Sequence, residues 1–567
     1  MKAFTKWSKS GIILILRKSD EMFKITINNQ VLEREDKVLL EDLAKELGIK
    51  AYCAKVNNRL RELTYYVNYN CEVEFLDLTN FDAVRVYETS LNYVMLMALE
   101  RLYPGLRVRI SQCVSRSVCC NVIDKKVKVD NKFLDKLKQE MDRIIKANYP
   151  IKRKSVTKEE AKKIYEEEGY FDKIEVLKYR EEDIVHMSEC DGYINYLYGY
   201  QLPSTGYLDK FALRLYYPGF LIQFPRAECG GEIPPFEESL SFAKMLKDAR
   251  DWSEMIGCAS IASLNNYASE ISMNDLVNIC ETKHNNMLSE LGERIKQDIH
   301  NIRVICIAGP SSSGKTTFAN RLRLELMSRG ITPLRISMDD YYLDSSLCPV
   351  GEDGKPDFEH IKSLDLELFN DNLINLIEGE EVSLPVYDFE KHARVFNGKT
   401  KISSTTPIII EGIHALNEEV TKLIPKNQKF KIYISPTSQI NIDDHSIVNA
   451  TDIRLLRRIV RDFRYRNTDP SRTFEMWPAV RRGEFRWIYP FQEEADYIYN
   501  SELTYELGVM KKYALPALQK IDTNDPNYIQ ANRLIKFLKY IRDIDEKYVP
   551  CNSLLREFIG GSCFYDV

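Results

Sequence analysis

The fold is decided by Val304–Thr316, VICIAGPSSSGKT, in which five apolar residues run directly into a loop of glycine and serine. Val304–Ala308 predicts a fully buried strand, and the pattern from Thr317 onward predicts a helix. From Gly309 the loop matches G-x-x-x-x-G-K-[ST] in full. Backbone N–H groups of such a loop line a concave anion site, and the helix N-terminus adds positive potential. The stretch therefore predicts a phosphate-binding loop, with Lys315 reaching the phosphates and the following threonine ligating Mg²⁺.

Strand–loop–helix units continue from this loop to about residue 500, and that alternation predicts a parallel α/β sheet. Leu334–Ser337 is a strand pattern followed by Asp339, whose carboxylate is a candidate to accept a proton from an attacking hydroxyl. A loop carboxylate that caps a turn is the alternative. Ile408–Ile410 is a buried strand pattern that ends at Glu411, which suits a contact to Mg²⁺ or water.

Two further segments carry chemistry. Pro385–Arg394, PVYDFEKHAR, brings aromatic, imidazole and guanidinium groups together, which suits a pocket for a stacked ring with polar edges. A β-edge and its loop is the alternative. Six arginines fall within 454–466, and helical spacing places several of them on one face. We favour a lid that closes over transferring phosphate over a solvated charge stripe.

Composition narrows the class of protein. The 567 residues carry 79 Lys and Arg against 84 Asp and Glu, a net charge of −5, and 44% are hydrophobic. These values exclude whole-chain disorder and argue against an electrostatically driven DNA binder. Thirteen cysteines without a C-x-x-C pair indicate reduced thiols in a cytoplasmic protein. No stretch reaches the roughly 18 apolar residues of a membrane span, so we expect no membrane partner.

The front half of the chain has a different organisation. Residues 1–21 are interpreted as an N-terminal extension, and strand and helix patterns over 22–80 suggest a small β-grasp-like unit. Residues 84–225 predict a second domain with helices at 84–104, 131–147 and 158–168. Residues 226–300 predict a helical connector, 301–500 the α/β domain and 501–567 a helical tail.

Five motifs in order over about 302–500 resemble the uridine kinase/phosphoribulokinase family of P-loop kinases. The resemblance implies that Asp339 is the general base for a nucleoside 5′-hydroxyl, that Lys315 is catalytic, and that Glu411 lies beside Mg²⁺ held by Thr316. Phe358-Glu359-His360 resembles the family's F-D-H segment, with a glutamate in the ribose-binding position. The implied ATP-binding residues are Gly309, Ser311, Ser312, Ser313, Gly314, Lys315, Thr316, Thr317, Arg458 and Arg461. The implied substrate-binding residues are Phe358, Glu359, Tyr387, His392, Arg394 and Arg458.

The chain departs from the family after Asp462. An ungapped match places Thr468 and Met476 where uridine kinases carry an arginine and a glutamine that contact the nucleoside. The preferred base is therefore left open. Segments near 477–496 and 554–562 resemble a longer bacterial branch labelled uridine or nucleoside kinase.

The N-terminal half resembles the front of threonyl-tRNA synthetases. Residues 22–80 resemble the TGS domain and 84–225 the second additional, editing domain, through Leu102–Gly105 and Pro203–Gly206. The editing histidines and cysteine of that family are replaced, counting from these motifs, by Tyr93, Met97, Leu197 and Gln201. No histidine precedes His186, so we expect no editing chemistry. A structural or regulatory appendage is favoured over retained tRNA binding.

The predicted fold is therefore α/β, with a P-loop NTPase parallel-sheet kinase domain behind a β-grasp TGS-like domain and an α+β editing-like domain. The resemblance implies an ATP-dependent nucleoside kinase of pyrimidine salvage that uses Mg²⁺. A kinase of another small hydroxyl acceptor and a nucleotide-gated protein that binds tRNA or a regulator are the alternatives. A homo-oligomer is left open.

Overall fold

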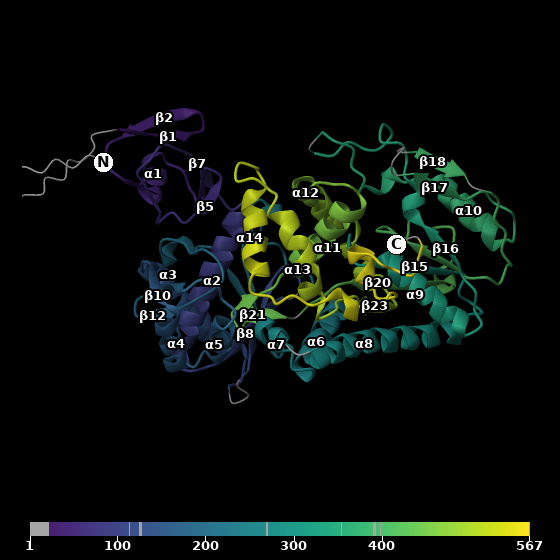
Figure 1. The fold of residues 1–567 in the computed structure, drawn as a ribbon, viewed down its shortest axis with the longest axis horizontal. Coiled ribbons are helices and arrows are strands. Elements are labelled where there is room, and N and C mark those ends of the chain that lie inside the picture. The colour runs from purple at the N-terminus through teal and green to yellow at the C-terminus, as the bar shows by residue number, and fades with distance from the viewer. Residues whose placement is uncertain are drawn as a thin grey trace, which may run out of the picture.

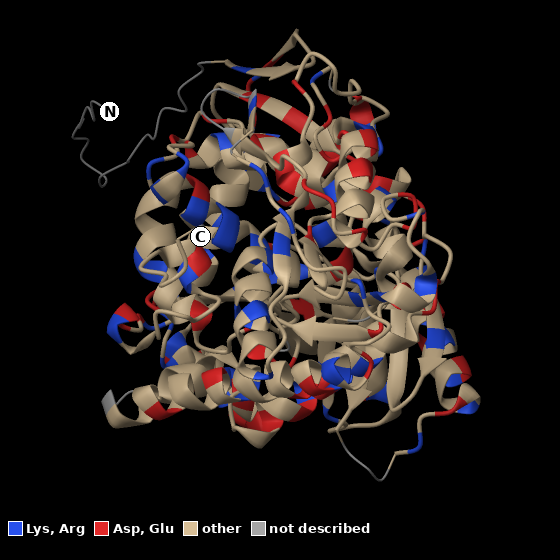
Figure 2. Ribbon diagram, turned by 90° about the vertical axis from the view of Figure 1, so that its right-hand side faces the viewer, with Lys and Arg blue, Asp and Glu red and all other residues tan. Residues whose placement is uncertain are grey.

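The computed structural model describes residues 22–112, 114–123, 127–267, 270–352, 354–388, 393–396, 398–438 and 440–565. Basic and acidic residues are interspersed along these elements in Figure 2, in keeping with the small net charge. No helix in the described ranges is both long and apolar enough to cross a membrane.

The first unit is a five-stranded sheet in the order β2-β1-β7-β4-β5, covered by α1 (Leu40–Glu46). Side chains alternate in β1, so that Phe23, Ile25 and Ile27 pack in one core with α1 while the intervening residues face outward. The strands are β1 (Phe23–Ile27), β2 (Gln30–Arg34), β4 (Cys53–Val56), β5 (Arg59–Arg61) and β7 (Cys71–Leu76), with β3 (Val38–Leu39) paired to β6 (Tyr66–Val67).

The second unit is built around α2 (Phe81–Leu102), which is buried along most of its length because apolar residues occupy nearly all of its faces. A four-stranded sheet, β13-β14-β9-β8, and a three-stranded sheet, β10-β11-β12, flank it. The other elements are β8 (Val108–Gln112), β9 (Val118–Val122), α3 (Asn131–Ala147), β10 (Lys152–Thr157), α4 (Lys158–Glu167), α5 (Phe171–Leu177), β11 (Ile184–Cys190), β12 (Tyr193–Asn195), β13 (Ala212–Tyr216) and β14 (Gly219–Gln223).

Three helices connect this half to the next: α6 (Leu240–Met255), α7 (Ile261–Asn266) and α8 (Glu270–Gln297). The long helix α8 extends along one edge of the molecule, beside α9 (Lys315–Ser328) (Figure 1). Leu276, Leu288 and Leu291 of α8 join the same core as Phe318 of α9, so the connector is packed against the following domain.

The second half contains the predicted parallel sheet, in the order β16-β19-β15-β20-β23. All five residues of β15 (Val304–Ala308) are buried because helices cover both faces of the sheet. Ile305 and Ile307 face the core that contains Phe318, whereas Val304 and Cys306 face the core of α10 (Leu366–Ile377). The other strands are β16 (Leu334–Ser337), β19 (Ile408–Glu411), β20 (Lys429–Ser435) and β23 (Tyr497–Asn500).

The remaining elements enclose this sheet. They are the hairpins β17 (Pro385–Asp388) with β18 (Ala393–Phe396) and β21 (Asn441–Asp443) with β22 (Ser446–Ile447), and the helices α11 (Ala450–Tyr465), α12 (Pro470–Trp487), α13 (Glu506–Leu518), α14 (Tyr528–Leu538) and α15 (Arg556–Ile559). Leu507, Leu534 and Phe558 share one core with the sheet, so residues 501–559 are packed against the kinase-like domain.

The two halves meet at the β21–β22 hairpin. Lys173 and Asp443 form an ion pair at 3.1 Å, with both side chains almost fully buried. Asp444 accepts hydrogen bonds from Arg107 and Arg109, and its carbonyl oxygen accepts one from the backbone N–H of Ile110 at 2.7 Å. Charged groups buried in this way depend on their partners, so the hairpin fixes the second unit against the kinase-like domain.

Candidate active site

The phosphate-binding loop lies between β15 and α9, and its glycines are required by close contacts. A Cβ on Gly309 would overlap the carbonyl oxygen of Ile434 on β20. Gly314 has φ +89°, and a Cβ there would overlap the side chain of Leu554. Ser312 also has positive φ. The loop therefore has a tightly enclosed backbone whose N–H groups and helix N-terminus suit an anion.

The polar side chains of the loop are placed for a ligand. The Nζ of Lys315 donates to the carbonyl oxygens of Gly309 and Pro310, at 3.0 and 3.3 Å. The hydroxyls of Ser312, Ser313 and Thr317 are buried and have no partner within the described residues. Buried hydroxyls without partners are costly, so these groups are suited to meeting phosphate oxygens or water.

Glu411 lies at the carboxyl end of β19, directly beside the loop. Its Oε1 accepts hydrogen bonds from Ser337 at 3.0 Å and from Thr316 at 3.4 Å. Burial raises the pKa of Glu411 to about 7, and the nearby negative charge of Asp339 raises it further. The parallel register that pairs Ser337 with Glu411 brings these oxygens together at one edge of the sheet. Such a set of carboxylate and hydroxyl oxygens fits a hard cation such as Mg²⁺.

Two adjacent aspartates follow β16 in a short 3₁₀ turn, Met338–Tyr341, and have different surroundings. Ser337 caps this turn by accepting from the Asp339 N–H at 3.3 Å. Asp340 accepts from the Tyr387 N–H at 3.0 Å and so ties the β17–β18 hairpin to the sheet. The Asp339 carboxylate accepts no hydrogen bond from the described residues. The turn-capping alternative therefore fits neither carboxylate, and Asp339 is left available to a ligand.

The predicted acceptor side contains an aromatic cluster. Tyr342 makes edge-to-face contacts with Phe358 and Tyr387, with centroid separations of 6.0 and 6.2 Å. Glu359 packs against Gly483 of α12 and is half-buried. Burial raises the pKa of Glu359 to about 7, although Arg458 and Lys315 lower it. Glu359 thus faces both the phosphate loop and an arginine of the predicted lid.

The other predicted substrate residues divide into two cases. Arg394 donates to Asp365 at 2.7 Å, so its guanidinium is held by the first turn of α10. His392 lies outside the described residues, and its predicted role stays a prediction.

The arginines of α11 have two distinct roles. Arg454 and Arg457 are buried and paired with Glu484 and Glu506, and each donates to a carbonyl oxygen of the phosphate loop. Arg458 donates to the Ser311 hydroxyl at 2.9 Å. The solvated-stripe interpretation therefore fails for these three positions, because all of them contact the loop.

A group of guanidiniums surrounds the next turn of α11. Arg458 and Arg461 both pair with Asp462, at 3.2 and 2.8 Å. Arg466 lies 3.9 Å from the same carboxylate, and the neighbouring charge of Arg461 lowers its pKa to about 10. Three cations thus share one carboxylate close to Asp339, and this excess of positive charge suits an anionic ligand.

Comparisons with known proteins agree with this geometry. Residues 304–506 match the family model of the phosphoribulokinase/uridine kinase family. A uridine kinase of Borrelia duttonii is 34% identical over 203 residues, which are 35% of this chain and 85% of that protein. The chain belongs to the phosphoribulokinase/uridine kinase family. A uridine kinase of Halalkalibacterium halodurans is 29% identical over 34% of this chain and 84% of its own length.

The N-terminal half has different relatives. A threonine–tRNA ligase of Thermotoga petrophila is 31% identical over 175 residues, 30% of this chain. The chain spans only 27% of that ligase. Among solved structures, a possible uridine kinase from Bacillus stearothermophilus aligns over 38% of this chain and 98% of its own, with 20% identity and a TM-score of 0.27.

The phosphate loop also receives contacts from the C-terminal segment that sequence reasoning missed. Glu557 of α15 accepts from the backbone N–H of Thr317, in the first turn of α9, at 3.0 Å. Leu554 covers Gly314, and the Tyr465 hydroxyl of α11 donates to the Ile559 carbonyl oxygen. Residues 554–559, the loop-covering segment, thus lie against the phosphate site. Only their polarity pattern is visible in the sequence, so no local signal reveals this contact.

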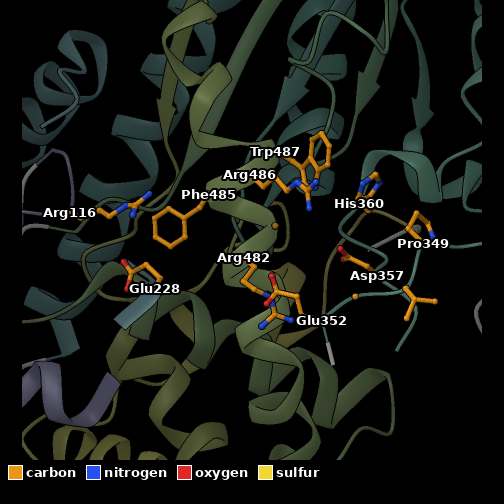
Figure 3. Close-up of a pocket in the computed structure, with 13 residues that line it drawn as sticks. Arg116, Glu228, Pro349, Glu352, Asp357, His360, Arg482, Phe485, Arg486 and Trp487 are labelled. Atoms are coloured by element: carbon orange, nitrogen blue, oxygen red, sulfur yellow. The ribbon is translucent and has the colours of Figure 1, made fainter. Parts of the chain in front are cut away.

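A pocket of about 560 Å³ adjoins the acceptor side of the kinase domain. Figure 3 shows Arg116 and Glu228, from the N-terminal half, on one side of it and His360 and Asp357 on the other. Arg116 lies 4.1 Å from the centroid of the Phe485 ring. The sequence motifs do not point to these N-terminal residues, because their approach to α12 depends on the packing of the two halves.

Proposed function

We propose that this chain transfers the γ-phosphate of ATP to the 5′-hydroxyl of a nucleoside. The observation that carries the proposal is the Asp339 carboxylate, which accepts no hydrogen bond from a described residue and lies near both Glu411 of the phosphate site and Tyr342 of the aromatic cluster. A nucleotide switch needs no acceptor pocket, whereas a kinase needs a base and a ring-binding wall on the far side of the γ-phosphate.

The proposed roles follow from position. Asp339 accepts the proton of the attacking hydroxyl, and Lys315 with Arg458 and Arg461 stabilises charge on the transferring group. Glu359 holds the sugar and Tyr387 contacts the base. Catalysis then rests mainly on positioning and electrostatics, as expected for phosphoryl transfer.

Thr316 and Glu411 are the proposed holders of Mg²⁺. The raised pKa of Glu411, caused by burial and by Asp339, indicates negative charge in need of a partner at this point. Bound there with ATP, the cation would supply charge neutralisation on the phosphate oxygens.

The test is ATP consumption with Mg²⁺ against uridine, cytidine, adenosine, inosine, guanosine and thymidine. We expect turnover on one or two nucleosides and a loss of about 10²–10⁴-fold in Asp339→Ala. Asp340→Asn is the matched control, because that neighbour holds the hairpin; it is expected to keep far more activity. ATP binding without turnover on any nucleoside would reject the proposal.

A kinase of another hydroxyl acceptor is the second candidate. It is favoured by Thr468 and Met476, which stand where the family's uridine kinases carry arginine and glutamine. The Thr468 hydroxyl donates a hydrogen bond to the carbonyl oxygen of Arg466 at 3.1 Å. The same assay with small polyols and sugars in place of nucleosides separates the two candidates.

A further inference from the structure

A second cavity, of about 800 Å³, lies at the junction of the two halves and is lined by residues outside the phosphate-loop motif. Its walls come from β5 of the first unit, α2 and residues 196–201 of the second, and α11 and α14 of the kinase domain. In Figure 1, α14 lies between β5 and α13, which places this junction. The volume is in the range of sites for small molecules.

Two buried amides in the wall of this cavity lack partners. Gln201 is 6% exposed, and neither its Oε1 nor its Nε2 has a hydrogen-bond partner in the described ranges. Asn92 is 5% exposed, and its Oδ1 is unpartnered in the same sense. Buried amides without partners cost free energy, so a ligand with donors and acceptors would be stabilised here.

Basic side chains converge on the same wall. Glu62 accepts from the backbone N–H of Gln201 at 2.9 Å and lies 3.6 Å from Arg153, which places residue 201 and this guanidinium on the same wall. Partial burial lowers the pKa of Lys536, the nearby Glu182 raises it, and the positive charges of Arg61 and Arg153 lower it. Lys536 forms no ion pair with any described residue. Acidic side chains line the cavity too, but Glu62 is paired with Arg153 and Glu182 with Arg180, whereas Arg61, like Lys536, forms no ion pair with a described residue. The unpaired positive charge at this wall suits an anion.

The lining is also aromatic, which narrows the ligand further. Tyrosines 196, 198, 200 and 528 line the cavity and are partly exposed. Rings of this kind stack on flat ligands, while the two amides match the polar edge of a heterocycle. An anionic group, a flat ring and a polar edge together describe a nucleotide.

The cavity is joined to the phosphate loop by one helix. Asp452, in the first turn of α11, lines the cavity and is held by Arg533 of α14 at 2.6 and 2.7 Å. Two and six residues further along α11, Arg454 and Arg458 contact Ser311 of the loop. A ligand that moves α14 or Asp452 therefore shifts the helix that brackets the loop.

We propose that this cavity binds a free nucleotide, with its phosphate against Arg61, Arg153 and Lys536 and its ring edge against Gln201 and Asn92, and that its occupancy acts on the phosphate loop through α11. The site is distinct from the proposed donor and acceptor sites. It does not depend on which hydroxyl the kinase phosphorylates.

The test titrates AMP and UMP, one purine and one pyrimidine, into the full chain by calorimetry. The Lys315→Ala background removes phosphate-loop binding, so a site that survives there lies elsewhere. We expect at least tenfold weaker binding in Lys536→Glu, a position that is largely at the surface, and in Gln201→Leu. Lys539→Glu is the matched control, because this residue directly follows α14 and is outside the lining.

Coupling is then measured as the dissociation constant of ATP in the wild-type chain, with and without the bound monophosphate. We expect a change of at least threefold that disappears in Lys536→Glu. Failure of both nucleotides to bind the Lys315→Ala chain would overturn the proposal, as would binding that ignores Lys536→Glu or leaves ATP binding unchanged. Lys536-dependent binding of tRNA alone would also overturn it, because an RNA chain would then be the occupant. Failure of the nucleoside panel leaves these binding results intact.

Discussion

Glu557 places a carboxylate on a backbone N–H that a phosphate-binding helix normally offers to its anion. It accepts from Thr317 at 3.0 Å, in the first turn of α9. Bound ATP brings further negative charge to the same helix terminus. Changing Glu557 to Gln keeps an acceptor for the N–H and removes the charge. We therefore predict that Glu557→Gln tightens ATP binding.

The magnitude follows from the position of the charge. Two unit charges about 5 Å apart at an effective dielectric of about 20 repel by roughly 3 kcal/mol. Glu557 is only half-buried, so solvent screens part of this repulsion. An expected gain of about 1–2 kcal/mol corresponds to ATP binding roughly five- to thirtyfold tighter.

The assay is calorimetric titration of ATP into wild-type, Glu557→Gln and Glu557→Asp chains, without acceptor. Glu557→Asp keeps the charge and is expected to show no such gain. The salt dependence supplies a second check, because the difference between wild type and Glu557→Gln is expected to shrink at high ionic strength. Equal or weaker binding by Glu557→Gln would show that the carboxylate supports the loop instead of competing with phosphate.

Three further predictions concern stability and the loop. Burial and the charge of Glu506 raise the pKa of Glu502 to about 7, so the folded state favours the protonated carboxyl and stability falls as the pH rises from about 4.5 through 7. In urea titrations, Glu502→Gln is expected to reduce the loss of unfolding free energy between pH 5 and 8 by about 2 kcal/mol, and an unchanged pH profile would contradict this. Arg457→Met leaves Glu506 buried and unpaired and is expected to lower the free energy of unfolding by about 3–5 kcal/mol. Adding Glu506→Gln is expected to recover part of this loss, and additive effects of the two changes would refute the pairing. Gly314→Ala forces a positive φ and overlaps Leu554, so ATP binding is expected to fall at least tenfold by calorimetry, and partial rescue by Leu554→Ala is the diagnostic result.

Much of the fold could be predicted because its signals are local. A continuous apolar run predicted β15 and an alternating strand pattern predicted β16, both at their observed bounds, and helical spacing predicted α3. The connector helices α6 and α7 were not separately predicted, because Gly and Pro residues interrupt the pattern around them. The alternation of strand and helix patterns predicted the parallel sheet, and the structure confirms it.

The site residues, too, could be predicted from the sequence where their signals are local and not where they depend on packing. The strand-end position of Glu411 suggested a contact to Mg²⁺ or water, and the structure places its carboxylate beside Thr316 of the phosphate loop. The spacing of the α11 arginines predicted a shared face, but only packing decides that Arg454 and Arg457 turn inward to Glu484 and Glu506. The nucleotide-sized cavity and the contacts of the loop-covering segment depend on residues hundreds of positions apart, for which one sequence carries no local signal.

The loop-covering segment has a consequence for the order of folding. Glu557 and Thr317 are separated by 240 residues, and contacts of such long range form late, because the intervening chain must first be ordered. The sheet and α11 are therefore expected to assemble before the phosphate site is enclosed. A nucleotide that requires the enclosed site would then stabilise the finished chain by slowing its unfolding, while leaving the rate of folding almost unchanged.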